Sequence, residues 1–114
     1  EVPLSCARAV LYRAADMVPF EVPTSEVCAV AKKDLAPGDT LDALGEYTYR
    51  AWIMERREAA AAKAVPCGLL EQGKVTKPIK MGELLTSANV AVDTASKIYQ
   101  LRQRQDDMLK SMAA

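Results

Sequence analysis

The chain has 114 residues, of which 50% are apolar and 26% charged, enough for one domain with a modest core. Fifteen Lys and Arg balance fifteen Asp and Glu, whereas nucleic-acid-binding domains usually carry a basic excess, and no apolar run is long enough to span a bilayer. The complete lack of histidine excludes His-based acid–base catalysis, Ser–His and Cys–His pairs, and His metal ligands. We therefore expect no nucleic-acid partner, no membrane partner, no metal site and no catalytic residue in this chain.

Three widely spaced cysteines, Cys6, Cys28 and Cys67, form no CxxC pair. Free thiols in a reducing compartment explain them better than a disulfide framework, so we expect a cytoplasmic protein. The chain starts at Glu1, without an initiator Met or a charged-then-apolar leader. We interpret it as a piece of a longer protein.

Both flanks of the chain are predicted to be helical, because all five glycines lie between residues 38 and 82. The first helix is expected from Pro3 to about Ala15, with apolar residues at i, i+3 and i+4 spacing: Leu4, Ala7, Val10, Leu11 and Ala14. The stretch from Phe20 to Ser25, framed by Pro19 and Pro23, is typical of a linker.

The middle of the chain contains short strand patterns and one helix. Strands are predicted at Val27–Lys32, Tyr47–Ile53 and Lys74–Ile79, and the second places Tyr47, Tyr49, Ala51 and Ile53 on one side. A helix is expected from Glu55 to Ala64, closed by Pro66 and Gly68, and Leu84 to Val90 leads into the last helix. The predicted core consists of Val30, Leu35, Leu41, Ile53, Ile79 and Leu85.

The last helix is predicted to start at Asp93 as its N-cap and to run toward Met112. It carries an apolar stripe of Ile98, Leu101, Met108, Leu109 and Met112. At about 1.5 Å per residue this helix is about as long as the domain is wide. Two interpretations remain open: the stripe packs on the domain's own core, or it docks on a neighbouring domain or subunit.

An internal repeat is visible when residues 33–41 (KDLAPGDTL) are placed over residues 77–85 (KPIKMGELL) at an offset of 44. Leu35 then matches Ile79, Gly38 matches Gly82, and Asp39 matches Glu83. Each copy predicts a strand, a tight turn at the glycine and a leucine that returns to the core, with the acidic residue accepting N–H groups of the turn. We expect a pseudo-twofold structure of short strands and turns.

These segments also carry a family resemblance. AKKDLAPGDTLD (31–42) and KPIKMGELLTSANV (77–90) resemble the two signature segments of the SAF domain, the antifreeze-like β-clip module. LGEYTYRAWI, VPCGLLEQGKV and the opening PLSCARAVLYRAAD are similar to the C-terminal SAF region of homoserine-dehydrogenase-like oxidoreductases. The resemblance implies a mainly β fold of the β-clip type with three parts: a helical lead-in and linker (1–25), the β-clip domain (26–92) and a C-terminal helix (93–114).

The resemblance further implies that the chain is the accessory C-terminal domain of an NAD(P)-dependent oxidoreductase and is not catalytic alone. One branch of that family reduces 1-deoxy-D-xylulose 5-phosphate for isoprenoid synthesis. The chain has no GxGxxG loop, so NAD(P) is expected on an upstream Rossmann-type domain of the same protein, and a homo-oligomer is expected. Two alternatives stay open: a free-standing SAF module that binds a small polar or anionic ligand or a partner protein, and a structural oligomerisation domain.

Four basic residues are candidate ligand contacts. Lys33, Lys77 and Lys80 lie next to the predicted turns and are candidates for binding an anionic, sugar-like ligand, although lysines of this kind are commonly only solvated. Arg50, flanked by Tyr49 and Trp52, is a candidate for stacking and for holding a carboxylate or phosphate. Asp34 and Asp39 are better explained as turn caps than as an acid–base pair.

Overall fold

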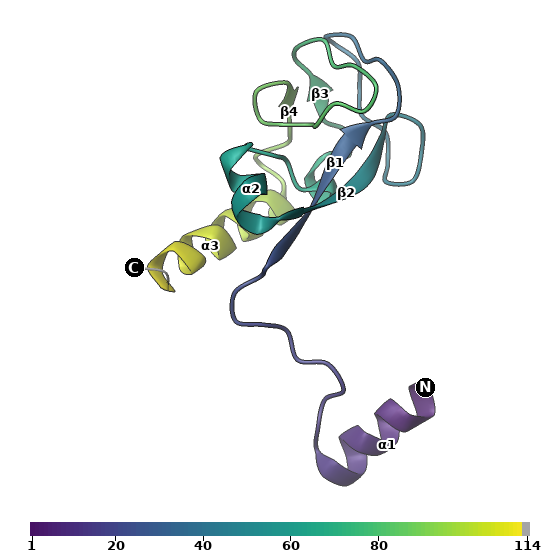
Figure 1. Ribbon diagram of the computed structural model, residues 1–114, viewed down its shortest axis with the longest axis vertical. Helices are drawn as coiled ribbons and strands as arrows, with labels where there is room; N and C mark the ends of the chain where they lie inside the picture. The colour runs from purple at the N-terminus through teal and green to yellow at the C-terminus, as the bar shows by residue number, and fades with distance from the viewer. Residues whose placement is uncertain (113–114) are drawn as a thin grey trace.

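The computed structural model describes residues 1–112, with the burial of side chains up to Lys110 (Figure 1). In chain order the elements are α1 (Val2–Tyr12), β1 (Ser25–Ala31), β2 (Tyr49–Glu55), α2 (Arg56–Ala61), the 3₁₀ turn η1 (Cys67–Leu69), β3 (Lys74–Val75), β4 (Val90–Ala91) and α3 (Lys97–Met112). Two small antiparallel sheets therefore combine with three α-helices, a mixed arrangement in which helices hold more residues than strands.

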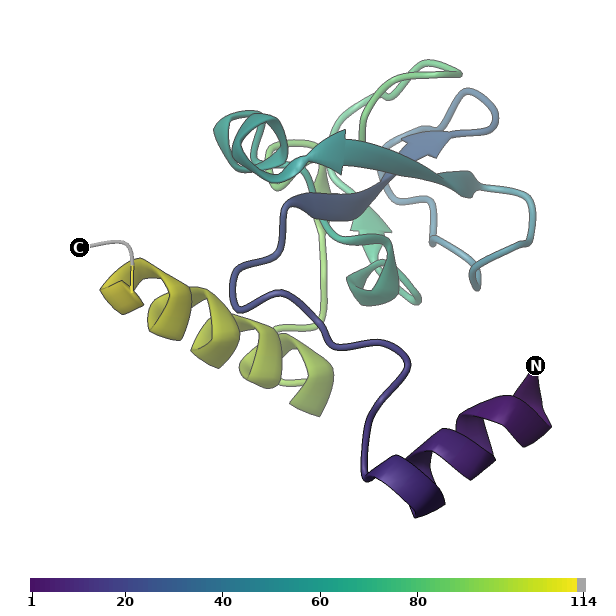
Figure 2. The same ribbon diagram turned by 60° about the horizontal axis from the view of Figure 1, so that its bottom comes forward.

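The N-terminal helix α1 stands apart from the rest of the chain, at the end of an extended linker (Figures 1 and 2). The radius of gyration is 17.3 Å and the longest extent 55 Å, whereas a compact domain of this length has a radius of about 13 Å. Pro3 is tolerated in the first turn of α1, and Arg13 ends the helix in a left-handed conformation at φ 50°, two residues earlier than expected. None of its residues is buried.

The centre of the fold is the antiparallel hairpin of β1 and β2, with Ser25 opposite Glu55 and Ala31 opposite Tyr49. The other edge of β1 pairs with residues 83–85: the N–H of Ala31 donates to the Glu83 carbonyl and the N–H of Leu85 to the Ala29 carbonyl, both at 2.9 Å. β1 therefore has neighbours on both edges, and its residues 28–31 are buried.

The second half of the chain repeats this arrangement. At the same 44-residue offset, the N–H of Val75 donates to the Asp39 carbonyl and the N–H of Leu41 to the Gly73 carbonyl, both at 2.9 Å. β3 therefore lies between β4 and residues 39–41, as β1 lies between β2 and residues 83–85. Each half of the chain supplies an edge segment to the sheet of the other half.

Both glycine turns have the geometry that the repeat predicts. Gly38 and Gly82 adopt φ values of +96° and +84°, a region that other residues rarely occupy. Their N–H groups donate to Val75 and Ala31, each at 2.8 Å. The carboxylate after each glycine accepts a turn N–H, Asp39 from Ala36 at 2.8 Å and Glu83 from Lys80 at 2.9 Å. The predicted role of these acidic residues is confirmed.

Five of the six predicted core residues are buried, and Ile53 is not. The buried five are Val30, Leu35, Leu41, Ile79 and Leu85, and other members of the core include Tyr49, Val65, Leu70, Val75 and Val90. Ile53 is 71% exposed, because no other layer covers that part of β2, and only Tyr49 on this face of the strand reaches the core. The predicted one-sided burial is therefore right at Tyr49 and wrong at Tyr47, Ala51 and Ile53.

Both later helices begin or end differently from the prediction. α2 spans only Arg56–Ala61, capped by the Glu55 carboxylate on the N–H of Glu58, and the chain turns at Lys63 with φ 53°. Asp93 accepts the N–H of Ala95 in a turn before α3, and the hydroxyl of Ser96 accepts the N–H of Tyr99 at 3.3 Å. Ser96, and not Asp93, is the N-cap of α3.

Candidate functional site

Four charged side chains join α3 to the rest of the domain. Arg102 of α3 donates to Glu26 of β1 and, at 3.1 Å, to Asp106, which also accepts from Arg56 of α2 at 3.1 Å. Arg56 lies 3.9 Å from Glu26. We call Glu26, Arg56, Arg102 and Asp106 the four-charge cluster.

The four-charge cluster is only 13–28% exposed at its side chains, and its two positive and two negative charges balance. The hydrogen bonds that Arg102 donates to Glu26, and then to Asp106, raise the pKa of its guanidinium although burial opposes this. Partly buried, mutually hydrogen-bonded charges of this kind hold two elements in one arrangement. The cluster therefore fixes α3 against β1 and α2.

Most of the apolar stripe of α3 does not face the domain. The half-buried side chains are Tyr99, Arg102, Asp106 and Leu109, whereas Ile98, Leu101 and Met108 are 53–58% exposed. Packing of the stripe on the domain's own core is thus wrong for these three residues. The side chain of Met112 lies outside the described part of the chain.

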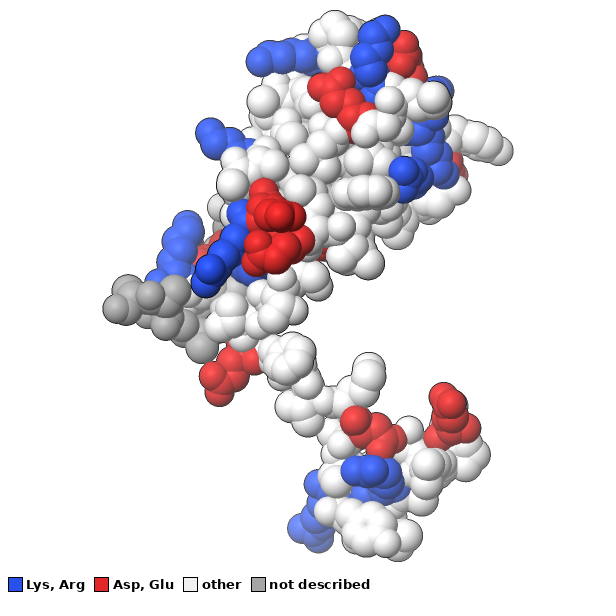
Figure 3. Space-filling model, viewed as in Figure 1, with Lys and Arg blue, Asp and Glu red and all other residues white. Residues whose placement is uncertain are grey.

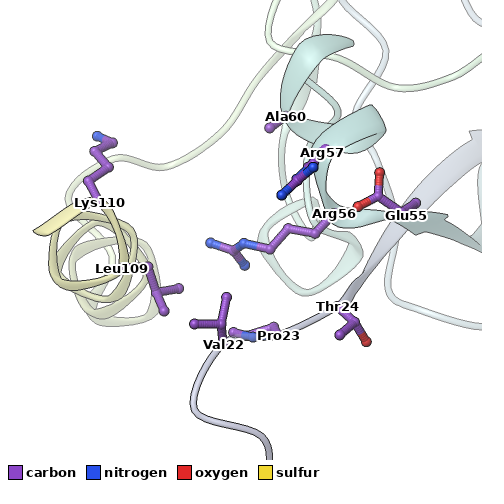
Figure 4. A pocket seen from close by; sticks show the side chains of 9 residues that line it. All are labelled: Val22, Pro23, Thr24, Glu55, Arg56, Arg57, Ala60, Leu109 and Lys110. Atoms are coloured by element: carbon purple, nitrogen blue, oxygen red, sulfur yellow. The ribbon is translucent and has the colours of Figure 1, made fainter. Parts of the chain in front are cut away.

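A cleft of about 570 Å³ lies between α2, α3 and the end of the linker (Figure 4). It is lined by Val22, Pro23, Thr24, Glu55, Arg56, Arg57, Ala60, Leu109 and Lys110. Arg56 reaches from α2 across the cleft toward α3, and Lys110 extends away from it. Arg56 and Lys110 already bind Asp106 and Asp107, so Arg57 is the one lining cation without a carboxylate partner among the described residues.

Lys80, a predicted ligand contact, already has a partner. Its ammonium lies 2.8 Å from the Asp34 carboxylate, which also accepts the N–H of Met81 at 2.9 Å. The hydrogen bond from Lys80, followed by the one from Met81, lowers the pKa of Asp34. The pair joins the two copies of the repeat and remains exposed, so Lys80 is less available to a ligand than its sequence position suggests.

Lys33 and Lys77 lie near the contact between the two copies of the repeat. Leu35 pairs with Ile79 in an antiparallel bridge, and each lysine stands two residues before its member of that pair in the sequence. Because the two segments run antiparallel, the two lysines lie on opposite sides of the bridge, and both are exposed. On the face of the molecule drawn in Figure 3, both signs of charge are mixed, without a large area of one sign.

Arg50 stacks as the sequence suggested. Its guanidinium carbon lies 4.9 Å from the centre of the Trp52 ring, and both side chains are exposed on β2. Among the described residues Arg50 has no carboxylate within ion-pair distance. It lies on a different element from the lysines and is not part of the α2–α3 cleft.

The sequence does not predict the four-charge cluster, because its members come from three segments that are far apart in the chain. The Arg102–Asp106 pair at i, i+4 was the one local signal.

Among the cysteines, Cys6 is exposed, and burial raises the pKa of the buried Cys28 and the half-buried Cys67. Within the described residues no group of three or more Cys, Asp or Glu side chains is arranged to hold a metal ion.

Neither a protein-family model nor a curated protein sequence matches this chain. Of the helices in the described range, none has the length and apolar character needed to cross a bilayer.

Proposed function

We propose that this chain is the accessory C-terminal domain of a larger NAD(P)-dependent oxidoreductase of the homoserine-dehydrogenase-like type. In this proposal α1 and the linker pack against a preceding domain, and the rest of the chain closes over or braces the catalytic site. NAD(P) binds to a Rossmann-type domain upstream. The same proposal gives the parent oxidoreductase a phosphorylated, sugar-like substrate such as 1-deoxy-D-xylulose 5-phosphate.

The observation that carries the proposal is the exposure of α1 and the linker. Every large apolar side chain between residues 2 and 22 is 48–88% exposed: Val2, Leu4, Val10, Leu11, Tyr12, Met17, Val18, Phe20 and Val22. Isolated helices of about eleven residues are marginal in water and depend on packing of their apolar face. A continuous exposed apolar segment of this kind marks an interaction site.

The fold we propose for residues 26–92 is the SAF-type β-clip with pseudo-twofold symmetry. The matched hydrogen bonds at the 44-residue offset support it, as do the positive φ values of Gly38 and Gly82. The carboxylate caps at Asp39 and Glu83 support the same fold. These features come from the segments that carry the resemblance.

The mass of the naturally expressed protein that contains this chain tests the proposal. Antibodies against the 114-residue chain capture that protein, and intact-mass measurement and NADPH fluorescence titration follow. We expect a mass several times 12.4 kDa and binding of NADPH by the captured protein. A mass near 12.4 kDa, or a larger protein that binds neither NADPH nor NADH, overturns the oxidoreductase assignment.

A second candidate function is self-association through α3, favoured by the exposure of Ile98, Leu101 and Met108. Sedimentation of the 114-residue chain and of its Leu101→Ser variant separates the two functions. A dimer that dissociates in this variant supports self-association. A monomer in both samples leaves the accessory role as the better account.

A further inference from the structure

The outer edge of β2 has unpaired backbone groups in its middle. In the β1–β2 hairpin the N–H of Lys32 donates to Thr48 at 2.9 Å, and the N–H of Arg56 donates to Thr24 at 3.0 Å. Along a strand, the backbone N–H and C=O groups of successive residues point alternately to one edge and to the other. The backbone groups of the even-numbered residues of β2 therefore point toward β1. The N–H and C=O of Ala51 and Ile53 therefore point away from β1.

Nothing in the described chain pairs with this edge. Neither Ala51 nor Ile53 makes a backbone hydrogen bond outside the hairpin, and β2 has β1 as its single neighbour in the sheet. Folded proteins usually protect such edges with a charge, a proline, a bulge or a covering loop. Between the charged Arg50 and Glu55, β2 carries Ala, Trp, Ile and Met without a proline, and the register with β1 runs without a bulge from Ser25 to Ala31.

The side chains along this edge have two different characters. On one face Ala51, Ile53 and its cross-strand neighbour Val27 form an exposed apolar row, with Ile53 71% and Val27 42% exposed. On the other face the Arg50 guanidinium lies over the ring of Trp52, which is 47% exposed. Arg50 has no carboxylate partner among the described residues, so the edge presents a positive charge that an incoming strand can neutralise.

We propose that this edge binds an extended, acidic peptide segment of a partner protein as an added antiparallel strand. The peptide backbone pairs with Ala51 and Ile53, and its apolar side chains cover the row formed by Val27, Ala51 and Ile53. A Glu or Asp opposite Arg50 forms the ion pair, strengthened by the stacking of the guanidinium on Trp52. This site does not depend on the oxidoreductase assignment, because it uses a different surface from α1 and the linker.

The register defines the peptide to be tested. In an antiparallel strand the residues opposite Ile53, Trp52, Ala51 and Arg50 follow one another from N to C. Acetyl-Thr-Val-Thr-Val-Glu-Thr-amide places its valines opposite Ile53 and Ala51 and its glutamate opposite Arg50. The control peptide carries Lys in place of Glu and is otherwise identical.

The experiment titrates the ¹⁵N-labelled 114-residue chain with each peptide up to millimolar concentration. Trp52, the one tryptophan of the chain, serves as a fluorescence probe. We expect shifts of the Ala51 and Ile53 amides, a Trp52 signal change and roughly tenfold tighter binding of the Glu peptide than of the Lys peptide. Equal affinity for both peptides, or shifts elsewhere on the chain, overturns the proposal.

Two variants separate backbone pairing from charge. Ala51→Pro removes an outward-pointing N–H that β1 does not use, and we expect loss of binding for both peptides. Arg50→Glu keeps the open edge, and we expect it to reverse the preference in favour of the Lys peptide. Ala51→Thr, a strand-forming residue at the same place, is the matched control that still binds. If instead the peptide-free chain sediments as a dimer in which Trp52 is shielded, a second copy occupies the edge and the acidic-peptide assignment is wrong.

Discussion

Leu35 and Ile79 exchange two backbone hydrogen bonds, each N–H donating to the other residue's carbonyl, at 2.8 and 3.0 Å. They occupy equivalent positions in the two copies of the repeat, and their side chains are only 3% and 1% exposed. The point where the two copies meet is therefore also a packed part of the core. Backbone pairing and apolar burial stabilise the same contact.

Replacing Ile79 by Ala is expected to lower the free energy of unfolding by about 2–4 kcal/mol, since it removes buried methyl groups and leaves a cavity. Met81→Ala is the matched control, because Met81 is 70% exposed two residues away and its loss is expected to cost less than about 0.5 kcal/mol. Urea denaturation of the three proteins measures both values. Equal losses in the two variants contradict the placement of Ile79 in the core.

Gly38→Ala is expected to destabilise the chain by about 1 kcal/mol, the cost of a left-handed backbone for a residue with a Cβ. A Cβ at Gly38 meets no atom within 4 Å, so the cost arises from the backbone alone. Gly68→Ala is the control: its site is equally open and its φ is not in the left-handed region. Urea denaturation is expected to show little or no loss of unfolding free energy for Gly68→Ala. A loss as large as that of Gly38→Ala contradicts the assignment of Gly38 to a turn that needs a left-handed backbone.

Asp106→Asn is expected to weaken the attachment of α3, because Arg56 and Arg102 both bind this carboxylate in a partly buried place. We expect a loss of about 1–3 kcal/mol in unfolding free energy and faster amide hydrogen exchange in α3. Asp107→Asn is the control, since its pair with Lys110 is more than 70% exposed and contributes less than about 0.5 kcal/mol. The role of the four-charge cluster is refuted if both variants exchange at the same rate.

Acid is expected to destabilise the chain partly through Asp42. Burial raises the pKa of this carboxyl, but the hydroxyl of Thr48 and the N–H groups of Tyr47 and Thr48 donate to it and lower its pKa overall. The unfolded chain therefore takes up this proton at a higher pH than the folded chain. The contribution of Asp42 is complete above the ordinary pKa of about 4 and is lost as the pH falls through the lower folded value.

Thermal melts between pH 6 and pH 2 test this assignment. The melting temperature of the natural chain is expected to fall more steeply below about pH 4 than that of Asp42→Asn. A Thr48→Val chain, which loses the hydroxyl donor, is expected to show a higher pKa for Asp42 by NMR titration. An unchanged acid dependence in Asp42→Asn assigns the effect to other carboxylates, among them Asp34.

Deleting residues 1–20 is expected to leave the melting temperature of the remaining chain unchanged, because α1 buries none of its residues. The deletion is also expected to reduce binding of hydrophobic dyes, since it removes exposed apolar side chains such as Leu11 and Phe20. Differential scanning fluorimetry and dye titration measure the two effects. A drop of several degrees in melting temperature indicates that α1 packs on the domain itself in solution.

The sequence predicted the repeat well, because each copy is specified by local features. A glycine in a turn, an acidic residue after it and a leucine that returns to the core leave the same pattern in sequence and in structure. Gly38 and Gly82, with the carboxylate caps after them, therefore appeared where they were expected. The turn chemistry depends on neighbours within a few residues, which a single sequence contains.

The predictions of burial for β2 and α3 were wrong, because burial depends on which other element packs against a given face. The alternation in β2 was interpreted as one buried face, yet Ile53 is exposed because no other layer covers that part of the strand. The stripe on α3 was likewise visible, but charged residues, Arg102 and Asp106, and not Leu101 turned out to face the domain. Periodicity shows which residues share a face and does not show which face has a partner.

The exchange of edge segments between the two halves has a consequence for how the chain assembles. Residues 83–85 complete the sheet of β1, and residues 39–41 complete the sheet of β3. Neither half has a closed set of strand contacts by itself. We therefore expect a cut at the exposed turn around Lys63 to give two fragments that are unfolded when separate and regain structure when mixed. The same dependence predicts that two intact chains can exchange halves and form an intertwined pair with the native hydrogen bonds.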